Sequence, residues 1–335
     1  MSPLTRGGWV RLLKTGPAVA AVVAATTAST IQPVIAHDFP DPAVLAVGSV
    51  YYAYSTASSY GNQVWHVPVQ RASALDGKWS VVGDAMPQLP PWVAKNGAAA
   101  TVWAPEVAAR SDGSYILYFT ARSGSKNVQC IGVALASSPK GPFESTGANP
   151  LVCRPEDVDS IDPSAFTDTN GKQYLLYTSG RGKATIWIQQ VSVDGVTPIG
   201  DRHALIQADR PEEGNIVEAP AMVKHGNKYV LFYSGNAFNS GKYFVNYASS
   251  TSLSSAFDKH DGQFLNRDTL GGGYTNPGGE EVVPGRKHDY LLFHAYTSPT
   301  QRSMFVAALS WDSSGNPTLD LKNLAKAPTK AKDKP

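Results

Sequence analysis

The stretch "GNIVEAPAMVKHGNKYVLFYSGN", residues 214–236, contains the unit that recurs along this chain. Glu218 precedes Ala219-Pro220, a short apolar run, a His-Gly-Asn turn and an apolar-aromatic run that begins at Tyr229. Two runs of strand-favouring residues on either side of a glycine-containing turn are typical of a β-hairpin. The stretch therefore predicts a hairpin with a carboxylate at its entrance.

The same arrangement occurs five times along the chain. The aromatic runs are spaced 64, 59, 55 and 61 residues apart, and they begin at Tyr51, Tyr115, Tyr174, Tyr229 and Tyr290. Each run follows a turn and a short apolar segment, and each of these segments follows or contains an acid: Asp41, Glu106, Asp162, Glu218 or Glu281. Because the acids occur at a similar point of every unit, we expect them at one end of a shared channel.

A period near 60 residues with strand-rich units predicts the fold class. We expect an all-β, single-domain protein, a five-bladed β-propeller over residues 37–320, with each blade a four-stranded sheet whose first strand lies nearest the axis. Helical repeats are disfavoured, because no long stretch shows apolar residues at a spacing of 3.6.

The charge distribution argues against nucleic acid as a partner. The formal net charge is +2, but three cations lie in the leading segment and the Lys-rich tail 321–335 carries +4, which leaves −5 on the body. A mildly acidic body lacks the basic face that a phosphate backbone requires. We expect the tail to be flexible.

The N-terminus predicts secretion. A cationic stretch is followed by "PAVAAVVAA", which is too short to span a bilayer and fits a signal peptide over residues 1–36. Small residues at 34–36 suit cleavage before His37, and a site after Ala28 also fits. We expect an extracellular protein that is free of the membrane after cleavage; the alternatives are a disordered N-terminus and an uncleaved anchor.

Two cysteines are compatible with that compartment. Cys130 and Cys153 flank a stretch that predicts a strand, a turn and a second strand, so we expect a disulfide that pins one hairpin. Two buried free thiols are the alternative.

Several carboxylates in one pocket point to a particular chemistry. Two carboxyl groups held at different pKa values can hydrolyse a glycosidic bond, one as a proton donor and the other as the activator of a water. A third carboxylate nearby can raise the pKa of the donor and position it. A single acid before a hairpin is more simply a hydrogen-bond acceptor at a turn, whereas five in series favour a functional channel.

The ordered set "FPDPAV", "WAPEVA", "SIDPSAF" and "VEAPAM" resembles glycoside hydrolase family 43, from about residue 37 to 317. That family comprises five-bladed propellers that act on arabinan, arabinoxylan, xylan and related polymers. The resemblance implies an inverting reaction in which Asp41 is the general base, Glu218 the general acid, and Asp162 the carboxylate that tunes and orients the acid. Inversion implies acid and base about 6.5–9.5 Å apart. Asp38 competes with Asp41 for the role of base.

The resemblance also extends to the surroundings of these acids. It suggests that Trp103 lines the pocket and Glu106 supports it, and that Arg302 meets sugar hydroxyls or a channel carboxylate; a core tryptophan and a surface arginine are the alternatives. His294 resembles a fifth-blade histidine that helps to hold a cation, often Ca²⁺, although a core histidine is the plainer interpretation. The chain departs from the family pattern at residues 279–281, Gly-Glu-Glu. No cofactor is otherwise required.

The resulting prediction is a secreted, monomeric α-L-arabinofuranosidase that acts on arabinan or arabinoxylan in plant cell walls. β-Xylosidase and endo-arabinanase are alternatives within the same family. From a different class, a non-catalytic carbohydrate-binding propeller also fits the fold.

Overall fold

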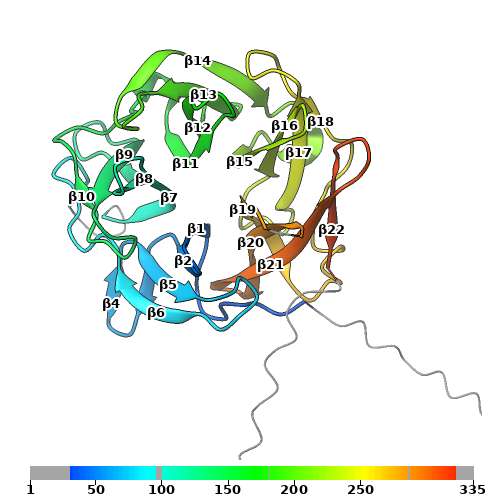
Figure 1. Cartoon of the computed structure of the whole chain (residues 1–335), viewed down its shortest axis with the longest axis horizontal. Helices are drawn as coiled ribbons and strands as arrows, with labels where there is room; N and C mark the ends of the chain where they lie inside the picture. Colours follow the sequence, from blue (N-terminus) through cyan, green and yellow to red (C-terminus); the bar gives the residue numbers. More distant parts are fainter. Residues whose placement is uncertain (1–30, 96–99, 181, 286, 322–335) are drawn as a thin grey trace, which may run out of the picture.

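Five antiparallel sheets of four strands form a ring around a common axis (Figure 1). The computed structural model describes residues 31–95, 100–180, 182–285 and 287–321. Most of the expected signal peptide and nearly all of the Lys-rich tail lie outside these residues. In Figure 1 the strands β1, β7, β11, β15 and β19 line the axis. The prediction of an all-β, five-bladed propeller is confirmed.

Each blade is built from one continuous part of the chain. Blade 1 consists of β1 (Ala43–Val47), β2 (Val50–Tyr54), β5 (Pro68–Ala72) and β6 (Ser80–Asp84), with β3 (Ser58–Tyr60) and β4 (Gln63–Trp65) as a separate hairpin. Blade 2 consists of β7 (Val102–Ala109), β8 (Tyr115–Arg122), β9 (Gln129–Ala136) and β10 (Glu144–Ser145). Blade 3 consists of β11 (Ser160–Thr167), β12 (Gln173–Ser179), β13 (Thr185–Val191) and β14 (Pro198–Gln207).

The last two blades follow the same order from the axis outward. Blade 4 consists of β15 (Val217–His225), β16 (Lys228–Gly235), β17 (Phe244–Ser250) and β18 (Asp258–Lys259). Blade 5 consists of β19 (Thr275–Val283), β20 (Asp289–Ser298), β21 (Gln301–Trp311) and β22 (Pro317–Asp320). Two 3₁₀ turns, η2 (Pro155–Asp157) and η3 (Pro211–Glu213), precede β11 and β15. Within the described ranges, no helix has the length and apolar character needed to cross a membrane.

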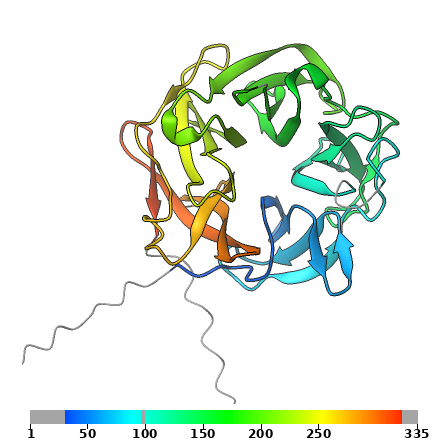
Figure 2. The same ribbon diagram turned by 180° about the vertical axis from the view of Figure 1, so that it is seen from behind.

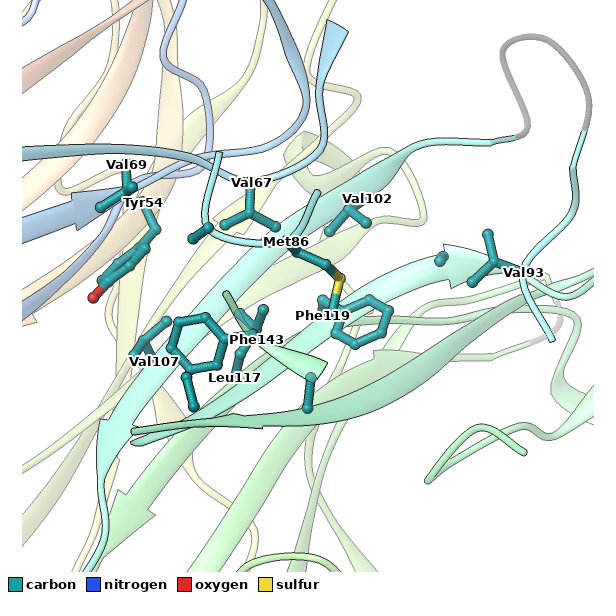
Figure 3. Packing of buried hydrophobic residues seen from close by; sticks show 14 of the residues in the cluster. Tyr54, Val67, Val69, Met86, Val93, Val102, Val107, Leu117, Phe119 and Phe143 are labelled. Carbon is teal, nitrogen blue, oxygen red and sulfur yellow. The ribbon is translucent and has the colours of Figure 1, made fainter. Parts of the chain in front are cut away.

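Large apolar side chains fill the space between neighbouring blades. Figure 3 shows the cluster between blades 1 and 2, where residues from both blades interdigitate: Tyr54, Val67, Val69, Met86, Val102, Val107, Leu117, Phe119 and Phe143. The aromatic runs found in the sequence are the second strands of the blades, and their apolar residues face these inter-blade cores. Burial of this apolar surface is the main favourable term that holds the ring together.

The N-terminal segment closes the ring between its last and first blades. Residues 34 and 35 pair with Met304 on β21. One edge of β21 pairs with β20, and β22 covers only residues 308–311 of the other edge. The N-terminal segment occupies the part of that second edge that β22 leaves uncovered. The segment runs along blade 5 before it enters blade 1 (Figure 2). Ile31 and Ile35 are buried. Residues 31–36 therefore pack as part of the folded body.

A disulfide joins Cys130, on β9, to Cys153. Between these two cysteines the chain completes β9, forms β10 and returns to pair with Ile131. The bridge thus fastens the outer part of blade 2.

Candidate active site

A left-handed residue followed by proline marks the inner strand of every blade. The five dipeptides are Asp41-Pro42, Ala104-Pro105, Asp162-Pro163, Ala219-Pro220 and Asn276-Pro277, with φ of 51°, 42°, 54°, 52° and 51° at the first residue. In blades 2 to 5 a β-bulge coincides with the dipeptide. A positive φ costs a non-glycine residue about 1–3 kcal/mol, so the surrounding packing must impose it.

This repeated dipeptide corrects the expectation that all five acids occupy one equivalent position. Counted from the proline, Glu218 lies two residues before, Asp41 and Asp162 one before, and Glu106 one after. Because these offsets differ, the acids do not form a single ring of equivalent positions.

Hydrogen bonds from one blade to the next hold the left-handed residues in place. In blades 1 to 4 the backbone N–H of this residue donates to a side chain of the preceding blade, over distances of 2.8–3.1 Å: Asp41 to His294 Nδ1, Ala104 to Thr56 Oγ1, Asp162 to Thr120 Oγ1, and Ala219 to Asp162 Oδ2. In blade 5 the N–H of Gly279 donates to Ser234 Oγ over 3.0 Å. These acceptors lie four or five residues after the tyrosine that begins each aromatic run, so their position also recurs in the sequence: Thr56, Thr120, Ser234 and His294.

Asp41 is surrounded by groups that favour its ionised form. Its carboxylate accepts a hydrogen bond from Thr56 Oγ1 at 2.5 Å and lies 3.2 Å from His294 Nδ1 and 3.5 Å from Arg302 Nη1. Burial alone would raise the pKa of Asp41, but the charge of Arg302, the nearby His294 and the hydrogen bond from Thr56 outweigh it and hold that pKa well below its usual range. Asp41 is therefore a carboxylate over the whole working range of pH.

Glycine is required beside this carboxylate. A Cβ on Gly279, which has a φ of 59°, would come within 2.6 Å of His294 Nδ1 and 2.7 Å of Asp41 Oδ1. Gly279 thus leaves room for the contact between Asp41 and His294.

Asp162 and Glu218 lie close to Asp41 and titrate in the opposite direction. Burial, followed by the charge of Asp41, raises the pKa of Asp162 to about 7. Burial, followed by the charges of Asp162 and Asp41, raises the pKa of Glu218 to about 8. Because Asp162 Oδ2 accepts the N–H of Ala219, it also fixes the backbone next to Glu218. The structure thus brings together the three acids predicted to act in catalysis and gives them different protonation states.

Asp38, the alternative base, is fully engaged by the protein. One carboxylate oxygen accepts a hydrogen bond from Ser58 Oγ at 2.8 Å, and the other accepts the backbone N–H of Arg302 at 2.9 Å. Asp38 therefore ties the N-terminal segment to blades 1 and 5.

A second group of carboxyls lies around a small enclosed cavity. Glu106, Glu280 and Glu281 line a space of about 40 Å³ together with Asp41 and Asp162. Glu106 accepts the N–H of Ala165 at 3.1 Å and shares a hydrogen bond with Glu281. The volume admits about three or four water molecules, at roughly 10–15 Å³ each. Glu106 is a buried residue of this space.

The shared proton of Glu106 and Glu281 predicts a pH-dependent stability. Burial raises the pKa of Glu106 to about 7, and burial together with Glu106 raises that of Glu281 further. Since both folded-state pKa values lie above the unfolded value near 4.5, the stabilisation is complete below that pH and is lost as the pH rises through about 7. We expect the Tm to fall over this interval.

Replacement of Glu281 by Gln should reduce this fall, because the amide donates to the Glu106 carboxylate without a titrating proton. Thermal unfolding from pH 4 to 9 measures the effect, with Glu144→Gln on exposed β10 as the matched control. An unchanged Tm profile in Glu281→Gln would contradict the shared proton.

The structure does not support the expectation of Ca²⁺ at His294. This ring is fully buried, and its Nδ1 accepts the backbone N–H of Asp41 and lies 3.2 Å from the carboxylate of the same residue. Among the described residues, no group of three or more His, Cys, Asp or Glu side chains is arranged to hold a metal ion. Calcium requires six to eight oxygen ligands, whereas His294 contributes one remaining nitrogen. The interpretation as a core histidine that orients Asp41 fits better.

Exposed aromatic side chains lie at the mouth of the site. Trp103, next to the left-handed residue of blade 2, is 39% exposed and therefore is not a core residue; its indole N–H donates to Thr101 Oγ1 at 3.2 Å. Phe238, which the sequence analysis did not single out, is 42% exposed, and the guanidinium of Arg302 lies 5.1 Å from its ring centroid. Flat exposed rings of this kind can stack on the apolar faces of sugars.

Tyr243 is the main contact of Glu218 that sequence reasoning missed. Its hydroxyl donates to Glu218 Oε1 at 2.8 Å, and its ring stacks on His294 at 6.0 Å between centroids. The residue is buried directly before β17, 25 positions beyond the acid that it contacts. Tyr243 therefore links the surroundings of Glu218 to those of Asp41.

A five-bladed ring with an ionised carboxylate next to buried carboxyls of raised pKa defines a site of the glycosidase class. The chain belongs to glycosyl hydrolases family 43, whose family model matches residues 30–317. The resemblance found in the sequence motifs is thereby confirmed.

Individual proteins of known name are similar to most of the chain. It is 28% identical over 313 residues to the "Probable arabinan endo-1,5-alpha-L-arabinosidase D" of Emericella nidulans, a match that covers 83% of this chain and 77% of the relative. It is 23% identical to the "Extracellular exo-alpha-(1->5)-L-arabinofuranosidase ArbA" of Cellvibrio japonicus, covering 86% and 88%. The crystal structure of a thermostable family-43 glycoside hydrolase superimposes with a TM-score of 0.73 at 25% identity, covering 87% of this chain and 95% of that one.

Proposed function

We propose that the protein hydrolyses α-L-arabinofuranosyl linkages of arabinan with inversion of configuration. The observation that carries this proposal is the separation of protonation states between Asp41, whose pKa is held low, and Glu218, whose pKa is raised to about 8. At neutral pH one group is a base and the other an acid, as an inverting cleavage requires.

In the proposed reaction, Glu218 gives its proton to the glycosidic oxygen as the bond to the anomeric carbon breaks. Asp41 removes a proton from a water that attacks the same carbon from the opposite face. The products are a sugar of inverted configuration and the remaining alcohol, with Asp41 protonated and Glu218 ionised. Exchange of protons with solvent restores both groups.

Asp162 has the role of tuning and orienting the acid. Its charge raises the pKa of Glu218, and its hydrogen bond to the N–H of Ala219 holds the strand that carries the acid. Arg302 neutralises Asp41, and Trp103 and Phe238 are positioned to contact sugar rings at the mouth of the site. Glu106 keeps a supporting role.

The names of the similar proteins support arabinan as the substrate, and they include both endo- and exo-acting enzymes. We favour exo action as an α-L-arabinofuranosidase, and the relative from Emericella nidulans makes endo-arabinanase the second candidate. Three observations support secretion: the N-terminal sequence, the disulfide, and the word "extracellular" in the name of the relative from Cellvibrio japonicus.

Release of sugar from linear arabinan, arabinoxylan and xylo-oligosaccharides tests this function. Arabinose as the only product from arabinan agrees with exo action, and a ladder of oligosaccharides agrees with endo action. Xylose from xylo-oligosaccharides would favour the β-xylosidase alternative. No reaction on any of them would favour a non-catalytic carbohydrate-binding propeller.

Removal of the Tyr243 hydroxyl should shift the alkaline limb of the pH profile. Its hydrogen bond lowers the pKa of Glu218, so Tyr243→Phe is expected to raise that pKa and to move the loss of kcat/KM to higher pH. Asp162 and Glu218 interact, so their apparent pKa values, near 7 to 8, belong to the pair. The unaltered protein should therefore lose activity as the pH rises through this range. Initial rates from pH 4 to 10 measure the limb; a lower rate with an unshifted limb would mean that Tyr243 only supports the fold.

A further inference from the structure

A pocket of about 440 Å³ lies beside the candidate active site, in blade 4. Its wall is formed by η3, by the loop between β16 and β17 at residues 236–243, and by the segment between β18 and β19 at residues 263–268. The volume is within the range of pockets that bind small molecules. The proposed chemistry at Asp41 and Glu218 makes no use of it.

Strand register places this pocket on the same face of the propeller as Glu218. Val217 pairs with Gly235, so the loop that follows β16 leaves the sheet at the end where β15 carries the acid. Val245 pairs with Leu265 at that same end, which brings residues 266–268 there as well.

Tyr243 connects the pocket to the acid. It forms part of the pocket wall, and its hydroxyl donates to Glu218. In an inverting cleavage the general acid lies beside the leaving group, whereas the base lies on the opposite side of the sugar. The leaving-group portion of a bound polymer therefore extends from the active site past Glu218 and Tyr243. In this direction it reaches the pocket.

The wall offers donors and acceptors in balance. Two cations, Lys242 and Arg267, and two anions, Glu212 and Asp268, line it together with side-chain amides. None of these four charged side chains makes an ion pair or hydrogen bond to another described residue, so their polar atoms are available to a ligand. Sugar hydroxyls both donate and accept hydrogen bonds, and the equal number of positive and negative groups favours a neutral sugar over an anion.

We propose that this pocket is a distal subsite for the leaving-group side of a neutral oligosaccharide chain, with Arg267 and Lys242 as its main hydrogen-bond donors. The inference rests on the proposed function for the identity of the sugar. The site would add affinity for long substrates and none for short ones.

The test compares Arg267→Ala with Arg71→Ala, an exposed arginine of β5 that lies toward the opposite end of blade 1. For linear arabino-oligosaccharides of increasing length, Arg267→Ala should lower kcat/KM roughly tenfold at the longer lengths, as expected for one charge-assisted hydrogen bond. With 4-nitrophenyl α-L-arabinofuranoside it should match Arg71→Ala within about twofold, because that leaving group is too short to enter the pocket.

An equal loss on 4-nitrophenyl α-L-arabinofuranoside, which places no sugar on the leaving-group side, would overturn the assignment to that side. Equal length dependence in Arg267→Ala and Arg71→Ala would overturn the subsite itself.

Binding separates this inference from the proposed function. Calorimetric titration of the oligosaccharides into the Glu218→Gln protein, with and without Arg267→Ala, gives Kd without turnover. If the unaltered protein cleaves no arabinan but Arg267→Ala weakens binding of long chains, the proposed function fails and the subsite stands. If no oligosaccharide binds, the subsite fails.

Discussion

Replacement of Glu218 by Gln is expected to lower kcat/KM on arabinan by roughly 10²- to 10⁴-fold, which is the range that general acid catalysis supplies. The amide cannot protonate the glycosidic oxygen, and arabinan has a poor leaving group. With a 2,4-dinitrophenyl α-L-arabinofuranoside the loss should be far smaller, because that leaving group departs without a proton. Initial rates on the two substrates measure the difference.

The matched control for this substitution is Glu144→Gln, on exposed β10, which should leave both rates unchanged. An equal loss on both substrates in Glu218→Gln would contradict the role of acid. A non-catalytic sugar-binding protein would show no turnover to lose.

Replacement of Asp41 by Asn is expected to lower kcat/KM by a similar factor, but on every substrate alike. A water must be activated whatever the leaving group, and an amide cannot accept its proton. The contrast with Glu218→Gln on the dinitrophenyl substrate is therefore the specific signature of a base. The same two initial-rate assays measure it.

Asp38→Asn is the control, because Asp38 lies three residues earlier and both of its oxygens already accept hydrogen bonds. It should lower the Tm more than the activity. If Asp38→Asn instead abolishes turnover while Asp41→Asn retains it, the assignment of the base is wrong.

The five blades and their order could be predicted from the sequence, because each aromatic run is local and repeats with a period near 60. The positions of Asp41, Asp162 and Glu218 could be predicted for the same reason, since each acid adjoins an inner strand. The X-Pro dipeptides are present in the sequence as well, and they align the blades better than the acids do, but their left-handed conformation comes from the structure. In blade 5 the dipeptide Asn276-Pro277 occupies the same position as the dipeptides of the other blades, although its first residue is not an acid.

The partners of the acids could not be predicted, because they come from other blades or from loops. Glu106 of blade 2 contacts Glu281 of blade 5, and Tyr243 reaches Glu218 from the loop before β17, which no repeat marks as special. Such contacts depend on how the ring closes and how its bulges turn the side chains. The pKa values depend on burial and on the sum of these contacts. The motifs could predict which residues are acid and base, but only the structure gives the physical cause of their different pKa values.

The most direct test of the account is the configuration of the sugar first released by the unaltered enzyme, followed by ¹H NMR from the start of the reaction. With Asp41 as base and Glu218 as acid, the anomer that appears first is the β-anomer of arabinose, and the α-anomer grows later by mutarotation. If the α-anomer is released first, the enzyme retains configuration, and the pairing of Asp41 with an attacking water is wrong.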